Sequence, residues 1–145
     1  MKRLLQRWFN LPPSKGAEFI TDNRGEKFWL IWTTHFGGGP KLMLIYRGHW
    51  VGTVESVIEE DGGLALADVI LFEHRYRLRG HGLGKAMLQH FVEYAREQGF
   101  SYLWGWLQPH EESTLEYLVE WYQRQGFQVY EVAPGKYHAR LELRR

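Results

Sequence analysis

The segment from Arg75 to Lys85 holds the residues whose types and spacing point most directly to chemistry. Three glycines recur at positions 80, 82 and 84, where an apolar β-prone run gives way to an amphipathic helical pattern. Glycine permits close backbone approach, so successive N–H groups can face one concavity at a helix N-terminus, where an anion is stabilised. Because arginines at 75, 77 and 79 add positive charge, the segment predicts a pyrophosphate site.

The residues of this segment do not fit the two common nucleotide-binding loop motifs. The segment lacks the Gly-Lys-Ser/Thr end of a Walker loop, and its glycine spacing is not G-x-G-x-x-G. No acidic residue follows about 20 positions later on a strand, as a Rossmann site requires. Nucleotide hydrolysis and dinucleotide binding are therefore disfavoured. A tight strand-to-helix turn bordered by solvated arginines remains the simpler alternative for this segment taken alone.

Hydrophobic periodicity predicts the elements that must position this segment. Over 19–72, β-prone runs alternate with glycine turn signals, which predicts an antiparallel meander. One helix follows the glycines and ends at Gly99, and a second begins with a capping box, Ser113 with Glu116, and ends at Gly126. The predicted strands cover 28–36, 41–46, 50–59, 64–72, 102–107, 127–132 and 136–143.

These elements make one domain over 1–145, of the α/β (α+β) class, with a mixed, mostly antiparallel central sheet and two late helices. Residues 1–13 form a short amphipathic helix, 73–99 the glycine loop and its helix, and 101–145 a strand, a helix and a hairpin. The apolar part of 1–13 is too short for a signal peptide, so we expect a cytoplasmic protein without stable membrane association.

Composition narrows the chemistry further. The formal net charge is +1, so no overall field would hold a nucleic acid, and the basic residues cluster only at the loop. The chain has no cysteine, which removes thiolate nucleophiles and disulfides. Its seven histidines form no compact ligand pair, so we expect no metal site. The pair Trp104 and Trp106 fits either sheet packing or stacking against an acceptor.

Two motifs give a family resemblance. Arg79-Gly-His-Gly-Leu-Gly84 has the form Arg-x-x-Gly-x-Gly, and Trp121-Tyr122-Gln-Arg-Gln-Gly126-Phe127 closes the second helix. Over 64–132 the chain resembles the GCN5-related N-acetyltransferase (GNAT) superfamily, which implies that fold and acetyl-coenzyme A (acetyl-CoA) as co-substrate. In that family the first motif binds the pyrophosphate, which implies a site formed by Arg77, Arg79, Gly80, His81, Gly82, Leu83, Gly84 and Lys85.

The chain departs from the family pattern in three places. The loop aligns either as 77–82 or as 79–84. The region 19–50 leaves little room for the two helices that the family usually places between its first two strands, so we expect the fold without clear early helices. Leu115 stands where many members have an asparagine, so that contact is not carried over.

The resemblance also implies catalytic roles. Tyr122 would donate to the departing thiolate, although it also continues an apolar helical stripe and could simply pack. Backbone N–H groups of Ile70, Leu71 or Phe72 would polarise the thioester carbonyl. The general base for the amine would be Asp68 or, less favoured, Glu55; a salt bridge is the competing role for such a carboxylate.

We therefore expect an N-acetyltransferase that moves an acetyl group to an amine of a small molecule or peptide. Direct attack in a ternary complex is favoured because no cysteine can carry the acetyl group. The alternative is a non-catalytic CoA-binding or interaction domain on the same fold. An exposed strand edge or the amphipathic N-terminus could join two copies as a homodimer.

Overall fold

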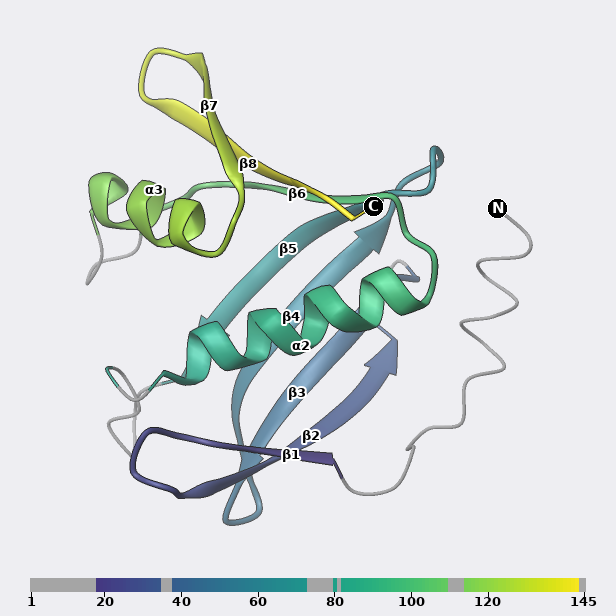
Figure 1. Cartoon of the computed structure of the whole chain (residues 1–145), viewed down its shortest axis with the longest axis vertical. Helices are drawn as coiled ribbons and strands as arrows, with labels where there is room; N and C mark the ends of the chain where they lie inside the picture. Colours follow the sequence, from purple (N-terminus) through teal and green to yellow (C-terminus); the bar gives the residue numbers. More distant parts are fainter. Residues whose placement is uncertain (1–17, 35–37, 73–79, 81, 110–113, 144–145) are drawn as a thin grey trace.

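A computed structural model describes residues 18–34, 38–72, 80, 82–109 and 114–143. Figure 1 shows one twisted sheet with helix α2 lying across it and the α3 helix near one end. The elements in chain order are β1 (Glu18–Thr21), β2 (Lys27–Thr34), β3 (Pro40–Tyr46), β4 (His49–Ile58), β5 (Leu64–Leu71), α2 (Leu83–Glu97), β6 (Tyr102–Trp106), α3 (Leu115–Arg124), β7 (Gln128–Ala133) and β8 (Lys136–Glu142).

The sheet has eight strands in the order β1-β2-β3-β4-β5-β6-β8-β7. All neighbouring pairs are antiparallel except β5 and β6, which run parallel. A parallel pair needs a long crossover, and the connection from β5 to β6 contains α2. The predicted mixed, mostly antiparallel sheet with two late helices is confirmed.

Two local predictions are corrected. The run beginning at Phe19 forms a separate strand, β1, which joins β2 in a hairpin that the sequence pattern did not resolve. The N-cap of α3 is Thr114 and not Ser113, because the Thr114 side chain accepts the Tyr117 N–H at 3.1 Å. Ser113 lies outside the described residues. The capping box predicted from Ser113 and Glu116 is therefore wrong by one residue.

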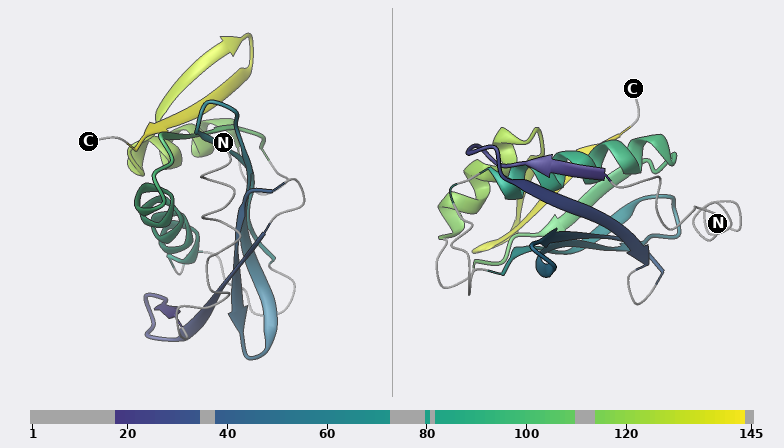
Figure 2. Two further views of the ribbon diagram at one scale, coloured as in Figure 1. Left: turned by 90° about the vertical axis from the view of Figure 1, so that its right-hand side faces the viewer. Right: turned by 90° about the horizontal axis from the view of Figure 1, so that it is seen from below.

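Strand alternation separates the two faces of β2–β4. Phe28, Leu42, Leu44 and Val54 are fully buried on the face covered by α2, which we call the inner face. From α2, Met87 and Phe91 are among the fully buried side chains of the same core cluster. Figure 2 shows α2 on this side of the strands, while no described element lies against the opposite, outer face. The apolar stripe of α2 thus packs in the same core as the inner face of these strands.

The strands β5 and β6 pair only at their beginnings. The paired positions are Leu64 with Leu103 and Ala65 with Trp104. Gly105 then permits a close approach, since a Cβ there would lie 3.2 Å from the Leu66 Cβ and 3.3 Å from the Leu66 carbonyl oxygen. Beyond this point the two strands diverge beside α3, as Figure 1 shows, and we call the region between them the aperture. Most of β5 therefore has an edge that β6 does not pair.

Residues 18–34 and 38–72 contain no helix, only strands and turns. The expectation that clear early helices are missing is confirmed for this described part. The predicted amphipathic helix over 1–13 lies outside the described residues. None of the described helices is long and apolar enough to cross a membrane.

Candidate active site

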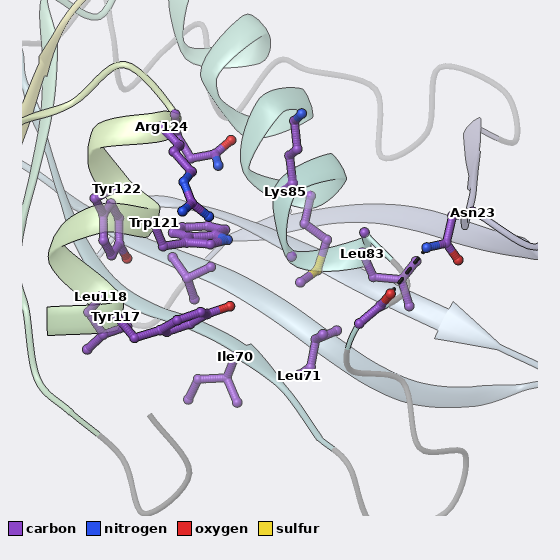
Figure 3. Close-up of a pocket in the computed structure, with 16 residues that line it drawn as sticks. Asn23, Ile70, Leu71, Leu83, Lys85, Tyr117, Leu118, Trp121, Tyr122 and Arg124 are labelled. Atoms are coloured by element: carbon purple, nitrogen blue, oxygen red, sulfur yellow. Dashed lines mark hydrogen bonds between the residues drawn. The ribbon is translucent and has the colours of Figure 1, made fainter. Parts of the chain in front are cut away.

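A cavity of about 590 Å³ lies where the end of β5, the start of α2 and the inner side of α3 meet. Figure 3 shows side chains from these three elements around it. Seven residues predicted from the sequence to bind the co-substrate line this large cavity: Ile70, Leu71, Gly80, Gly82, Leu83, Gly84 and Lys85. Arg77, Arg79 and His81 lie outside the described residues.

The N-terminus of α2 is arranged as an anion site. Its N-cap is Gly82, whose φ of 79° is the left-handed conformation that glycine adopts without a steric penalty. No side chain caps the first turn, and that turn contains no acidic residue. Among the described residues no side chain thus accepts from the N–H groups of the first turn, and Lys85 adds positive charge. Both alignments of the loop, 77–82 and 79–84, contain Gly80 and Gly82, which line the cavity.

The hairpin turn between β1 and β2 supports this loop from the side. Asp22 has a completely buried side chain, and its Oδ1 accepts N–H groups of Arg24 and Glu26 at 2.9 Å each. Burial opposes ionisation of Asp22, but hydrogen bonds from the Arg24 side chain and from both backbone groups lower its pKa overall. Asn23 extends from this fixed turn and donates from Nδ2 to the Gly80 carbonyl at 3.2 Å (Figure 3). Sequence reasoning missed this contact.

Helix α3 supplies the opposite wall of the large cavity. Tyr117, Trp121 and Gln125 recur at a spacing of four and line it together with Arg124. Trp121 also lies near the start of α2, since a Cβ at Gly84 would be 3.7 Å from the indole. Sequence reasoning did not assign these four residues to the site, although Trp121, Arg124 and Gln125 lie within the motif that ends in Phe127. Their helical spacing was the available signal.

The unpaired edge of β5 clarifies which backbone donors are available. Phe72 donates its N–H to the Val51 carbonyl of β4 at 2.8 Å, so it is not the free donor that the sequence allowed. N–H groups of successive residues on a strand point to opposite sides. The N–H of Leu71 therefore points away from β4, toward the aperture, whereas that of Ile70 points toward β4.

Tyr122 stands between the large cavity and a smaller one of about 250 Å³. Its ring contacts Trp121 and Phe127 edge to face, at centroid distances of 5.0 and 5.3 Å. Burial raises the pKa of its phenol to about 12. Tyr122, Leu118 and Val69 line both cavities, so the two spaces meet at this wall.

The small cavity reaches the outer face of the sheet, since two of the residues that line it, Asp68 and Trp106, are exposed there. Asp68 from β5 and Trp106 from β6 line it. Glu55 is directly opposite Asp68 on β4 but does not line either cavity. Its Oε1 lies 2.9 Å from Lys41 Nζ. Asp68 and Tyr122 thus line the same small cavity, and Glu55 has a salt bridge, which was its competing role.

The part of the outer face formed by β6 and β8 is aromatic. Trp104 and Trp106 lie edge to face at 5.8 Å, and both approach His138, with centroids 6.0 and 5.9 Å away. Trp104 is fixed by a hydrogen bond from Nε1 to Glu59 at 2.8 Å, whereas Trp106 is about half exposed. Trp104 therefore packs, and Trp106 remains accessible at the small cavity. Within the described residues no cluster of His, Asp or Glu could hold a metal ion.

Comparisons with known proteins agree with this geometry. The sequence matches the model of the Acetyltransferase (GNAT) family over residues 3–127. No protein with a curated function matches the sequence.

Solved structures share the fold at low sequence identity. The GNAT domain of S. lividans PAT has a TM-score of 0.71 at 13% identity, covering 91% of this chain and 99% of that one. An IAA acetyltransferase from Bacillus cereus has a TM-score of 0.58 at 20% identity, covering 72% and 77%. A GNAT family acetyltransferase from Elizabethkingia anophelis with acetyl-CoA bound has a TM-score of 0.56 at 14% identity, covering 72% and 76%.

Proposed function

This chain belongs to the GNAT acetyltransferase family, whose fold and chemistry imply acyl transfer from acyl-CoA, and we propose that it is an acetyl-CoA-dependent N-acetyltransferase. The observation that carries the proposal is the position of Tyr122, at the wall shared by the large cavity and the small cavity. One space suits the acetyl donor and the other an acceptor amine. A group at their junction can act on the bond that is exchanged.

The residues around the large cavity fit acetyl-CoA. The uncapped first turn of α2, with Lys85 beside it, suits the pyrophosphate. The unpaired edge of β5 offers backbone groups to an extended amide-containing arm, as a neighbouring strand would. When bound, acetyl-CoA supplies an acetyl thioester. The chain's own residues then orient that group and manage the protons.

The carbonyl of the acetyl group needs a donor where negative charge develops. We assign this role to the N–H of Leu71, which points toward the aperture and lies at the cavity. The amine needs a proton acceptor, because an alkyl amine with a pKa of about 10 is mostly protonated at neutral pH. Asp68 takes this role, directly or through water, because it lines the space where the amine enters.

Tyr122 acts on the departing sulfur. A thiol has a pKa of about 8.5, and burial raises the pKa of Tyr122 to about 12. The phenol therefore keeps its proton against a thiolate and stabilises it by donating a hydrogen bond. In the net reaction a C–N bond forms and the C–S bond breaks. The proton that the amine loses ends either on the sulfur of the product thiol or in solvent.

Two measurements test the proposal. Acetyl-CoA at 100 times its dissociation constant should stabilise the protein by about 2.7 kcal/mol and raise the melting temperature by several degrees. A panel of primary amines should then release free thiol from acetyl-CoA in proportion to acetylated product. Stabilisation without thiol release from any amine would favour a non-catalytic CoA-binding domain, and the absence of both would contradict each function.

A further inference from the structure

The outer face of the sheet carries an apolar band that no described element covers. Register places Phe19, Trp29 and Ile45 opposite one another across β1, β2 and β3, with Trp50 next on β4. Ile31 extends the band along β2. Residues paired in this way share a face. The band thus crosses four strands, a width of about 14 Å, on the side of the sheet opposite α2 (Figure 2).

The exposure of this band is unusual for side chains of its kind. Phe19, Trp29, Ile31 and Trp50 keep between 39% and 46% of their surface accessible. Single exposed apolar residues are ordinary, whereas contiguous patches mark interaction surfaces. Aromatic side chains are enriched at the centres of such surfaces. The band therefore has the composition of a docking surface.

The same face already holds ammonium groups. Lys41 Nζ lies 2.9 Å from Glu55 Oε1 and 4.5 Å from the centre of the Trp50 ring. Lys27 Nζ lies 4.5 Å from the centre of the Phe19 ring. On this face the chain's own lysine ammonium groups are thus held by a carboxylate and by aromatic rings. Asp68 and Trp106 present the same two groups at the aperture.

The size of the small cavity limits what enters it. At about 250 Å³ it is smaller than the roughly 300–1,000 Å³ of sites that enclose whole small molecules. A volume of about 250 Å³ can hold one unbranched alkyl amine. Tyr122 and Leu118 close its inner end, where it meets the large cavity. The rest of an acceptor must therefore lie on the open outer face.

We infer that the acceptor is a polypeptide that rests apolar residues on the outer face and passes a lysine side chain through the aperture to Tyr122. This inference rests on the proposed function and narrows its substrate class. An apolar residue of the acceptor would cover Ile31 and Trp29 while the lysine ammonium meets Asp68 and Trp106. A half-exposed band that shares the outer face with Asp68 and Trp106 of the small cavity suits this arrangement, because small-molecule sites are concave and enclosing.

The test compares three acceptors. They are a capped peptide with one lysine flanked by leucines, the same peptide with serines in place of the leucines, and n-butylamine. Ile31→Ser removes an exposed aliphatic side chain from the band, and Val132→Ser removes one of similar exposure from β7, 46% against 48%. Trp29→Ala is a second band variant, and melting temperatures establish that each protein is folded.

For the native protein, kcat/KM for the leucine-flanked peptide should exceed that for the serine-flanked peptide and for n-butylamine by at least tenfold. Ile31→Ser and Trp29→Ala should each lower kcat/KM for the leucine-flanked peptide about tenfold and leave n-butylamine within twofold. Val132→Ser should leave all three acceptors unchanged. This pattern would support the inference.

Several results would overturn it. Equal kcat/KM for n-butylamine and both peptides would indicate a small acceptor while leaving the N-acetyltransferase function intact. Sedimentation showing a dimer that Ile31→Ser dissociates would assign the band to a second copy of the chain. A severalfold gain in peptide turnover on Trp8→Glu would assign the band to the chain's own first residues. Loss of thiol release with every amine would instead contradict the proposed function itself.

Discussion

Replacing Tyr122 by phenylalanine removes one hydroxyl at the junction of the two cavities and leaves the ring in place. The contacts with Trp121 and Phe127 at 5.0 and 5.3 Å involve only the ring, so the substitution should preserve packing. A hydrogen bond to a charged group contributes about 1.5–3 kcal/mol. Since about 1.4 kcal/mol corresponds to a tenfold change in rate, kcat should fall about 10- to 150-fold while acetyl-CoA affinity stays within twofold.

The assay is thiol release under saturating acetyl-CoA and amine, with acetyl-CoA affinity taken from the melting-temperature shift. Tyr117→Phe is the matched control, because Tyr117 lies in the same helix and lines the same cavity but is more than half exposed. It should retain native kcat. Burial raises the pKa of Tyr122 to about 12, so its phenol stays protonated from pH 7 to 9, and the Tyr122→Phe defect should be constant over that range.

A kcat for Tyr122→Phe equal to that of the native protein would refute the donor role and leave Tyr122 as a packing residue. An equal loss in Tyr117→Phe would also refute it, because the effect would then belong to the helix surface in general. A defect that appeared only below pH 8 would show that the phenol titrates near neutrality, against the effect of its burial.

Three further outcomes are expected. Gly82→Ala places a Cβ at a φ of 79° and should raise KM for acetyl-CoA, whereas Gly135→Ala, at 74° in the distant β7–β8 turn, should cost similar stability, about 1 kcal/mol, without a change in KM. Asn23→Ala removes the hydrogen bond to the loop and should raise KM for acetyl-CoA severalfold at unchanged kcat in steady-state kinetics. Burial and a carboxylate hydrogen bond raise the pKa of Tyr102 to about 12, so its stabilising contribution is present below pH 10 and is lost as pH rises toward 12; melting temperatures of Tyr102→Phe should decline less over that range.

The loop and both helices were predictable because their signals are local. Glycines at 80, 82 and 84 next to an apolar helical stripe identify a strand-to-helix turn within about twenty residues of sequence. The same holds for α3, whose apolar stripe predicts which side of the helix packs. Only its N-cap, Thr114, differs from the prediction. The strand β1 was missed because its four residues are too few to show a period.

The roles of the two acidic candidates depend on register instead. A one-residue shift in strand pairing moves every side chain to the other face, so no local pattern could show that Glu55 meets Lys41 while Asp68 lines the small cavity. The contact of Asn23 with Gly80 joins residues 57 positions apart. Such a contact requires that β1 and the end of β5 be brought together by the sheet.

By itself the sequence determined the glycine-rich turn before the first helix, the class of fold, the two helices and the family motif that contains Tyr122. All of these follow from side-chain type and short-range spacing, which govern local backbone conformation. The tertiary structure alone decided that β5 and β6 separate after two paired positions, and that Tyr122 lies between two cavities. It also decided that Asp68 and Trp106 line one of these cavities, because strand pairing and helix placement are settled by packing across the whole chain.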